Sequence, residues 1–369
     1  MAQSRAPALK RVPGLWLRLT SFGNLLASAE AAAAGKRKRP DVAAFLLDLE
    51  PNLLQIRRQL LDGSYQPGPY RTFLIHEPKP REISAAPFRD RVVHHALTRV
   101  LDPIFEKRFS PLSFACRKGF GVHKALQVAR KGCQQFPYVL KCDVAKYFAS
   151  IDHGILQAKL ARVVGCAATL RLAATIIASA GEGTSSAHPE VVKYFPGDDL
   201  FTPFERRRGL PLGNQTSQFF ANVYLDALDQ MVTRIIRPGC YARYVDDVVV
   251  FSDSKGELGE ILVQLERKVA CDRLCFHPRK SRIYRTTEGL TFLGWRIFPD
   301  RSRLVRANIA GFTRRLRKLH ADFHADRVAL DTVQQSVNAW IGHAAHGDTW
   351  TIRQRILERF SFATKCERT

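Results

Sequence analysis

Apolar residues recur along the chain at characteristic spacings, and these spacings predict most of its elements. Between 41 and 61 they recur at helical spacing, which predicts an amphipathic helix, and Gly63 predicts where that helix ends. The alanine-rich residues 151–180 predict further helix, as do residues 258–269 and the last segment, 301–369. Helix is therefore expected in several separate parts of the chain.

Shorter apolar runs predict strands. Residues 70–100 predict a strand, a basic turn, a second strand and a helix. The run YVL predicts a buried strand that leads to Asp143. Residues 241–252, YARYVDDVVVFS, predict two strands joined by a turn that carries Asp246 and Asp247. Three aspartates are thus expected where strands end.

These aspartates are candidates for a metal site. Two adjacent acids in so apolar a segment are costly to bury unless their charge is compensated, and a divalent cation does this well. The alternative for Asp246 and Asp247 is a solvated hairpin tip, because Asp is common in turns. Asp143 favours the metal site, since three carboxylates from two strands can hold two Mg²⁺ ions roughly 3.5–4 Å apart.

The composition indicates the kind of partner. The 369-residue chain carries 57 Lys and Arg against 34 Asp and Glu, a formal charge of +23 that predicts binding to nucleic acid, with an anionic membrane surface as the alternative. No stretch reaches the roughly 18 consecutive apolar residues that span a bilayer, so no membrane insertion is expected. Cys271, Cys275 and His277 lack the second half of a zinc site, and reduced thiols in a cytoplasmic protein are expected.

The Asp143 strand, the YVDD turn at 244–247 and residues 207–229, RRGLPLGNQTSQFFANVYLDALD, together resemble the palm of a reverse transcriptase. The resemblance implies an α+β fold of the right-hand polymerase type, with fingers, a palm built on an antiparallel sheet, and a helical thumb. It divides the chain into a basic N-terminal helical extension, fingers with palm, and thumb, at residues 1–69, 70–300 and 301–369. The implied activity is RNA-directed DNA synthesis by two-metal-ion nucleotidyl transfer.

The resemblance also implies roles for particular residues. Two Mg²⁺ ions, with Mn²⁺ as an alternative, would be held at Asp143, Val144, Asp246 and Asp247. Lys280 matches a basic residue near the nucleotide and is a candidate proton donor to pyrophosphate, with an ordinary phosphate contact or a surface charge as alternatives. The residues implied to contact the incoming nucleotide are Lys79, Arg81, Phe148, Gly213, Gln215 and Gln218. Those implied to contact primer or template are Arg89, Arg91, Phe292, Leu293, Gly294, Trp295, Arg314 and Arg315.

Phe148 and the basic residues among these assignments also have structural alternatives. Phe148 lies where the family places a bulky ring that excludes ribonucleotides, and its alternative is a core aromatic. Each single basic residue has a solvent-facing alternative. Gly294 would allow close approach of the primer backbone. Uncharged donors and acceptors for a template base or nucleotide are offered by Asn214, Gln215, Ser217 and Gln218.

One departure from the family pattern indicates a subgroup. Where intron-encoded and retroviral-type relatives carry Gln-Gly and Ser-Pro, this chain has Leu212-Gly213 and Ser217-Gln218. This resembles reverse transcriptases of diversity-generating retroelements, which misincorporate opposite template adenines. The implied partners are a template RNA, an RNA/DNA primer duplex, deoxynucleotides and a small basic accessory variability protein. The alternatives are a group II intron-like or phage-defence reverse transcriptase, or a non-catalytic RNA-binding protein on the same fold.

Overall fold

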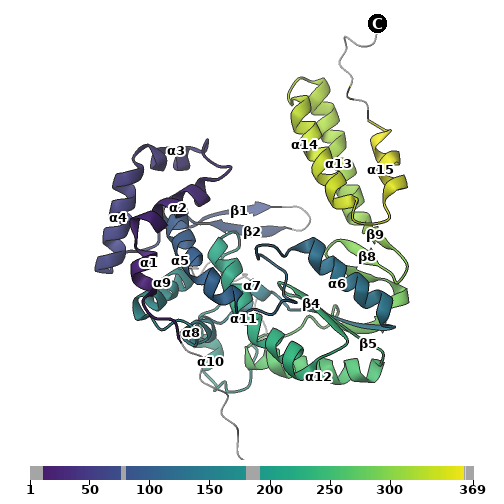
Figure 1. Ribbon diagram of the computed structural model, residues 1–369, viewed down its shortest axis with the longest axis horizontal. Coiled ribbons are helices and arrows are strands. Elements are labelled where there is room, and N and C mark those ends of the chain that lie inside the picture. Colours follow the sequence, from purple (N-terminus) through teal and green to yellow (C-terminus); the bar gives the residue numbers. More distant parts are fainter. Residues whose placement is uncertain (1–10, 76–79, 180–191, 361, 363–369) are drawn as a thin grey trace, which may run out of the picture.

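The computed structural model describes residues 11–75, 80–179, 192–360 and 362. Within them, helices combine with three antiparallel sheets, which agrees with the expected mixture of helix and antiparallel sheet (Figure 1). No helix in these ranges has the length and apolar character needed to cross a bilayer.

The N-terminal third is mainly helical. Its helices are α1 (Leu15–Leu19), α2 (Phe22–Ala33), α3 (Pro40–Leu47), α4 (Leu49–Asp62) and α5 (Phe88–Glu106). The single helix expected over 41–61 is wrong, because Asp48 adopts φ −111° and ψ 45° and separates α3 from α4. Gly63 ends α4 with φ 78°, so the predicted helix end is confirmed.

A two-stranded hairpin precedes α5. Strands β1 (Arg71–Ile75) and β2 (Arg81–Ala85) pair in antiparallel register, with Arg71 opposite Ala85 and Ile75 opposite Arg81. The two strands and the helix predicted over 70–100 are therefore confirmed, while the basic turn at 76–79 lies outside the described residues.

The central sheet carries the predicted aspartates. Its strands lie in the order β4 (Cys240–Tyr244), β5 (Asp247–Ser252), β3 (Tyr138–Asp143) and β6 (Arg282–Arg285). One face packs against α11 (Gln215–Met231) and α12 (Lys255–Cys271) through a core that includes Leu140, Val248 and Val250. The other face packs against α6 (Val122–Gln135) through Val139, Val249 and Phe251. Alternation along each strand therefore assigns every side chain to one of two environments.

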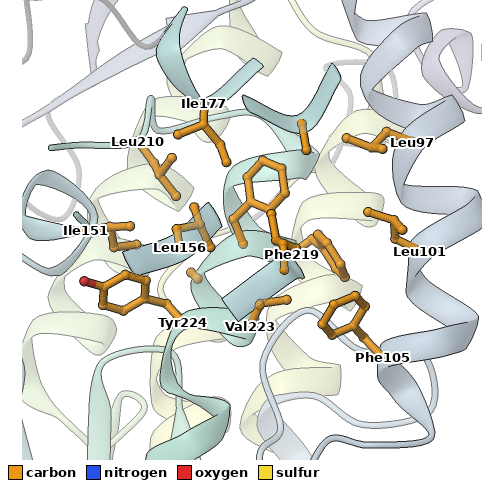
Figure 2. Close-up of a cluster of buried hydrophobic side chains, with 14 of the residues drawn as sticks. Leu97, Leu101, Phe105, Ile151, Leu156, Ile177, Leu210, Phe219, Val223 and Tyr224 are labelled. Carbon is orange, nitrogen blue, oxygen red and sulfur yellow. The ribbon is translucent and has the colours of Figure 1, made fainter. Parts of the chain in front are cut away.

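Helix α11 lies in the middle of the largest core. Figure 2 shows Phe219, Val223 and Tyr224 of α11 among apolar side chains from α5 and from the segments around 151–156, 177 and 210. The ring of Phe219 lies edge-on to that of Phe105, with centroids 5.2 Å apart. The remaining elements of this region are α7 (Tyr147–Ser150), α8 (His153–Ala161), α9 (Ala167–Ala178), α10 (Thr202–Glu205) and the π-helical turn η2 (Val232–Ile236).

The C-terminal part begins with a small sheet and continues as helices. The turn η3 (Thr286–Glu288) leads into strands β7 (Leu290–Phe292), β8 (Trp295–Ile297) and β9 (Ser302–Leu304), followed by helices α13 (Arg306–His324), α14 (Leu330–Ala344) and α15 (Trp350–Leu357). Strand β9 lies inside the segment expected to be entirely helical, because it completes the sheet by pairing with β8. The three helices project from one end of the molecule (Figure 1) and have a core of their own, in which the rings of Phe312 and Trp340 stack 3.9 Å apart.

Candidate active site

The sheet register brings the aspartates together. Asp143 is the last residue of β3 and lies directly opposite Asp247, the first residue of β5. Asp246 occupies the turn before Asp247, and its carbonyl accepts a hydrogen bond of 3.1 Å from the amide of Val144. Two carboxylates at the ends of neighbouring strands and a third from the adjoining turn are therefore grouped at one end of the sheet's inner strands. The side chain of Val144 itself is buried in the core.

The backbone around this group is strained. Val245, in the turn between β4 and β5, has φ 56°, and Lys146 and Leu293 have φ 45° and 48°. A left-handed conformation is rare for residues other than glycine and is a genuine outlier for a β-branched residue such as Val245. Such strain costs on the order of 1–3 kcal/mol and persists only where the surroundings hold it.

Burial shapes the electrostatics of the group. Burial, followed by the charges of Asp247 and Asp143, raises the pKa of Asp246 to about 6. Burial also raises the pKa of Asp247, with the charge of Asp143 adding to the effect and Lys141 opposing it. Oδ1 of Asp247 is buried and has no hydrogen-bond partner among the described residues. The site thus concentrates negative charge that lacks full compensation.

Two lysines partly neutralise the carboxylates. Nζ of Lys280 lies 2.9 and 3.0 Å from the oxygens of Asp143. Nζ of Lys141 lies 3.5 Å from Asp247 Oδ1 and donates a hydrogen bond of 2.8 Å to the carbonyl of Thr291 in β7. The lysines bring positive charge against two of the three acids.

The donor set fits a hard divalent cation. In the described ranges, no group of three or more His, Cys, Asp or Glu side chains closes around one metal position. Burial and the neighbouring carboxylates nonetheless raise the pKa values of Asp246 and Asp247, and a divalent cation would relieve this repulsion and stabilise the ionised forms. Carboxylate oxygens are the ligands that Mg²⁺ prefers.

The loop before α11 is joined to the β1–β2 hairpin. The amide of Ser84 donates to the carbonyl of Leu212, and the Asn214 side chain donates to the carbonyl of Ser84 and accepts from the amide of Ala86. The expectation that Asn214 faces a base or nucleotide is therefore wrong, because both ends of its buried amide bind β2 and the residue that follows it. A Cβ on Gly213, which has φ 108°, would lie 2.7 Å from Ile83, so only glycine fits there.

The other described residues expected to contact the nucleotide come from α11, β2 and α7. Gln215 and Gln218 are exposed at the start of α11. Arg81 is exposed at the beginning of β2, and Lys79 lies outside the described residues. Phe148, in α7, is half-buried and packs against the main core while remaining partly exposed.

Two of the expected template contacts are engaged within the chain. Arg89 hydrogen bonds to the carbonyl of Gln66 and to the side chain of Gln59, and it pairs with Asp90. Arg91 forms an ion pair of 2.6 Å with Asp41. Both guanidinium groups thus join α5 to the N-terminal segment.

The turn between β7 and β8 packs against α13. Phe292 and Trp295 are fully buried, while Leu293 and Gly294 form the turn with positive φ. A Cβ on Gly294 would lie 2.5 Å from the Asn308 side chain, so the close approach at this glycine is made by α13. Arg314 and Arg315 are exposed on the same helix.

Several site residues were missed by sequence reasoning. Lys141 precedes Asp143 by two positions on the same strand. Because side chains alternate between the two faces of a strand, this spacing was the signal that Lys141 lies on the same face as Asp143. Arg243 interrupts an apolar strand, which marks a buried charge that needs a partner. That partner, Asp229, lies on another element, and nothing in the local sequence identifies it.

Comparison with known proteins assigns a family to this geometry. Residues 75–297 match the family described as Reverse transcriptase (RNA-dependent DNA polymerase). The chain is similar to Protein YkfC of Escherichia coli (strain K12), with 24% identity over 288 residues, which are 67% of this chain and 71% of that protein.

Two intron-related proteins are also similar. Nuclear intron maturase 2, mitochondrial, of Arabidopsis thaliana is 32% identical over 129 residues, covering 31% of this chain and 18% of the maturase. Group II intron-encoded protein LtrA of Lactococcus lactis subsp. cremoris is 24% identical over 193 residues, covering 50% of this chain and 29% of LtrA. The chain therefore spans less than a third of either intron-related protein.

Proposed function

Because the chain belongs to the reverse transcriptase family of RNA-dependent DNA polymerases, we propose that it copies an RNA template into cDNA at the carboxylate group of Asp143, Asp246 and Asp247. The observation that carries this proposal is the register that sets Asp143 opposite Asp247 beside the strained turn. A protein that only binds RNA has no need for a partly buried acid cluster whose charge two lysines compensate only in part.

Reverse transcriptases use divalent metal ions, and the three aspartates, with the backbone of Val144, are proposed to hold two Mg²⁺ ions. When bound, such ions activate a primer 3′-hydroxyl and stabilise the leaving pyrophosphate. Lys280, which pairs with Asp143, is proposed to stabilise pyrophosphate and to donate a proton to it. Lys141 holds Asp247 and links it to β7.

The surrounding residues are proposed to select and hold the substrates. Arg81 and Lys79 neutralise the triphosphate, Phe148 excludes the ribose 2′-hydroxyl, and Gly213, Gln215 and Gln218 border the base pair being formed. Residues 292–295 support the primer end, and Arg314 and Arg315 contact the backbone of the template–primer duplex.

Within the family, we propose a mutagenic enzyme of the diversity-generating kind, acting with a small basic accessory protein. Leu212-Gly213 and Ser217-Gln218 support this subgroup, since they stand where intron-encoded and retroviral-type relatives carry Gln-Gly and Ser-Pro. A group II intron-like reverse transcriptase is the second candidate, favoured by the similarity to intron-encoded LtrA.

Primer extension on a defined RNA template tests the proposal. Wild-type protein with Mg²⁺ and four deoxynucleotides is expected to make cDNA, and Asp246→Ala is expected to lose nucleotide addition by about 10³-fold or more while it still binds RNA. Retained synthesis in Asp246→Ala would refute the metal-site assignment. Errors concentrated at template adenines support the mutagenic subgroup, and accurate cDNA supports the intron-like alternative.

A further inference from the structure

A buried ion pair lies behind the turn that carries Asp246 and Asp247. Arg243 comes from β4 and Asp229 from α11, and both are 0% exposed. Arg243 lies opposite Val248 in the register, whereas Tyr244 lies opposite Asp247. Alternation therefore directs Arg243 to the face that packs on α11, away from the face that bears the carboxylates.

The pair is fully satisfied. Nε of Arg243 donates to both oxygens of Asp229 at 2.8 and 3.0 Å, and Nη2 donates to Oδ2 at 2.6 Å. The hydroxyl of Tyr241 donates to Oδ1 of Asp229 at 2.6 Å. Burial alone would lower the pKa of Arg243, but the Asp229 carboxylate outweighs it and raises that pKa, so the guanidinium stays charged.

The guanidinium also reaches the catalytic turn. Nη1 of Arg243 donates a hydrogen bond of 2.8 Å to the carbonyl of Val245, the residue with φ 56°. Nη2 donates one of 2.8 Å to the hydroxyl of Ser113. The planar guanidinium group has enough donors to make these contacts and to bind Asp229 at the same time, which the single ammonium group of a lysine cannot do.

We propose that Arg243 is a positioning residue for nucleotide addition: it holds the Val245 carbonyl in the left-handed turn, so that Asp246 and Asp247 face Asp143. Asp229 fixes the guanidinium from α11, the helix that begins at Gln215. The ion pair thereby sets the carboxylates relative to the helix that borders the nucleotide. This inference rests on the proposed function, because it assigns a role at the same site.

Arg243→Lys tests the inference by keeping the charge and removing the fork. The affinity of the protein for Mn²⁺, measured by electron paramagnetic resonance without nucleic acid, is expected to fall about tenfold. The kcat of primer extension is expected to fall about 10- to 100-fold, because small misplacements of reacting groups are costly. The KM for template–primer is expected to stay within about twofold of wild type.

Tyr241→Phe is the matched control. It removes a hydroxyl from the same buried network but leaves the hydrogen bond to Val245 intact. Thermal stability is expected to fall, while Mn²⁺ affinity and kcat stay at wild-type levels. Adding Val245→Gly to Arg243→Lys is expected to recover part of the kcat, since glycine adopts the left-handed turn without strain.

Each outcome decides the inference. Arg243→Lys with wild-type Mn²⁺ affinity and kcat overturns it, as does a Tyr241→Phe variant that loses both to the same extent. If Arg243→Lys does not fold, Asp229→Asn, which keeps the shape of the side chain that fixes the guanidinium but removes its charge, takes its place under the same criteria. A wild-type protein that binds Mn²⁺ without adding nucleotides refutes the proposed function, and the Mn²⁺ comparison then decides the inference alone.

Discussion

Phe148 has a structural role in the core and a proposed role in substrate selection. The side chain packs against the main core and stays partly exposed close to the carboxylate strand. Phe148→Ala is expected to reduce discrimination against ribonucleotides by about 10- to 100-fold, because it removes the ring that we propose excludes the 2′-hydroxyl. Competition between dATP and ATP in primer extension measures the effect.

Phe148→Tyr keeps the ring and serves as the control for this prediction. It is expected to retain the discrimination of wild type. Unchanged sugar selection in Phe148→Ala would leave Phe148 with only its packing role.

His94 governs a pH dependence of stability. It is buried in α5, neither ring nitrogen has a hydrogen-bond partner among the described residues, and burial, followed by the charge of His95, lowers its pKa to about 4. Between pH 6.5 and 4 the unfolded state takes up a proton that the folded state does not, so stability is lost as pH falls through this window. The loss is on the order of 1–3 kcal/mol.

His94→Leu is expected to reduce this acid sensitivity and to raise stability at pH 7 by about 1 kcal/mol, since it removes two unpaired polar atoms. Urea unfolding at about pH 4.5 and at about pH 7, on either side of the titration, measures both effects. The prediction would be contradicted if the free energy of unfolding changed equally between the two pH values in the wild type and in His94→Leu.

At this scale, sequence reasoning succeeds where the chemistry is local. Asp143, Asp246 and Asp247 were predictable because each follows or interrupts an apolar strand. Arg243 and Asp229 form one unit only after α11 folds against β4, and the register between these elements is not encoded in either segment alone.

At the scale of elements, the side chain of Asn214 joins β2 to the loop before α11. Asn214→Ala breaks two buried hydrogen bonds to the backbone of Ser84 and Ala86 and is expected to cost about 1–3 kcal/mol of stability. The KM for deoxynucleotides is expected to rise more than kcat falls, because the hairpin loses its fixed position against the exposed start of α11. Steady-state kinetics and thermal unfolding together measure this.

Gln215→Ala is the stability control for that prediction, since Gln215 is the exposed neighbour of Asn214. It is expected to unfold within about 0.5 kcal/mol of wild type. Equal losses of stability in Asn214→Ala and Gln215→Ala would mean that the two hydrogen bonds of the Asn214 side chain do not stabilise the fold.

Elements with strong periodicity were predictable, and their interruptions were not. The hairpin and helix over 70–100 and the two strands over 241–252 occur as expected. The break at Asp48 and the strand β9 depend on packing partners elsewhere in the chain, which single-segment patterns do not contain. Asn214 was misjudged for the same reason, because its partners lie at β2 and directly after it.

At the scale of the whole molecule, the formal charge of +23 predicts strongly salt-dependent binding of a template–primer duplex. A footprint of about six phosphates loses about 10³-fold in affinity between roughly 50 and 200 mM salt, because bound cations are released from the nucleic acid. Fluorescence anisotropy with a labelled duplex measures the slope of affinity against salt. A flat response would exclude backbone contacts as the main source of affinity.

Two arginine variants in the C-terminal helical region test where the protein contacts the duplex. Replacing Arg315, which is exposed on α13, by Gln is expected to reduce the slope by about one, for the phosphate that is no longer neutralised, and to weaken binding similarly for all template sequences. Arg327→Gln removes an equally basic side chain that is already paired with Asp322 at 2.7 and 3.0 Å. Its slope is expected to match wild type, since a cation held by a carboxylate releases few counterions on binding. Equal slopes in all three proteins would place the duplex away from α13.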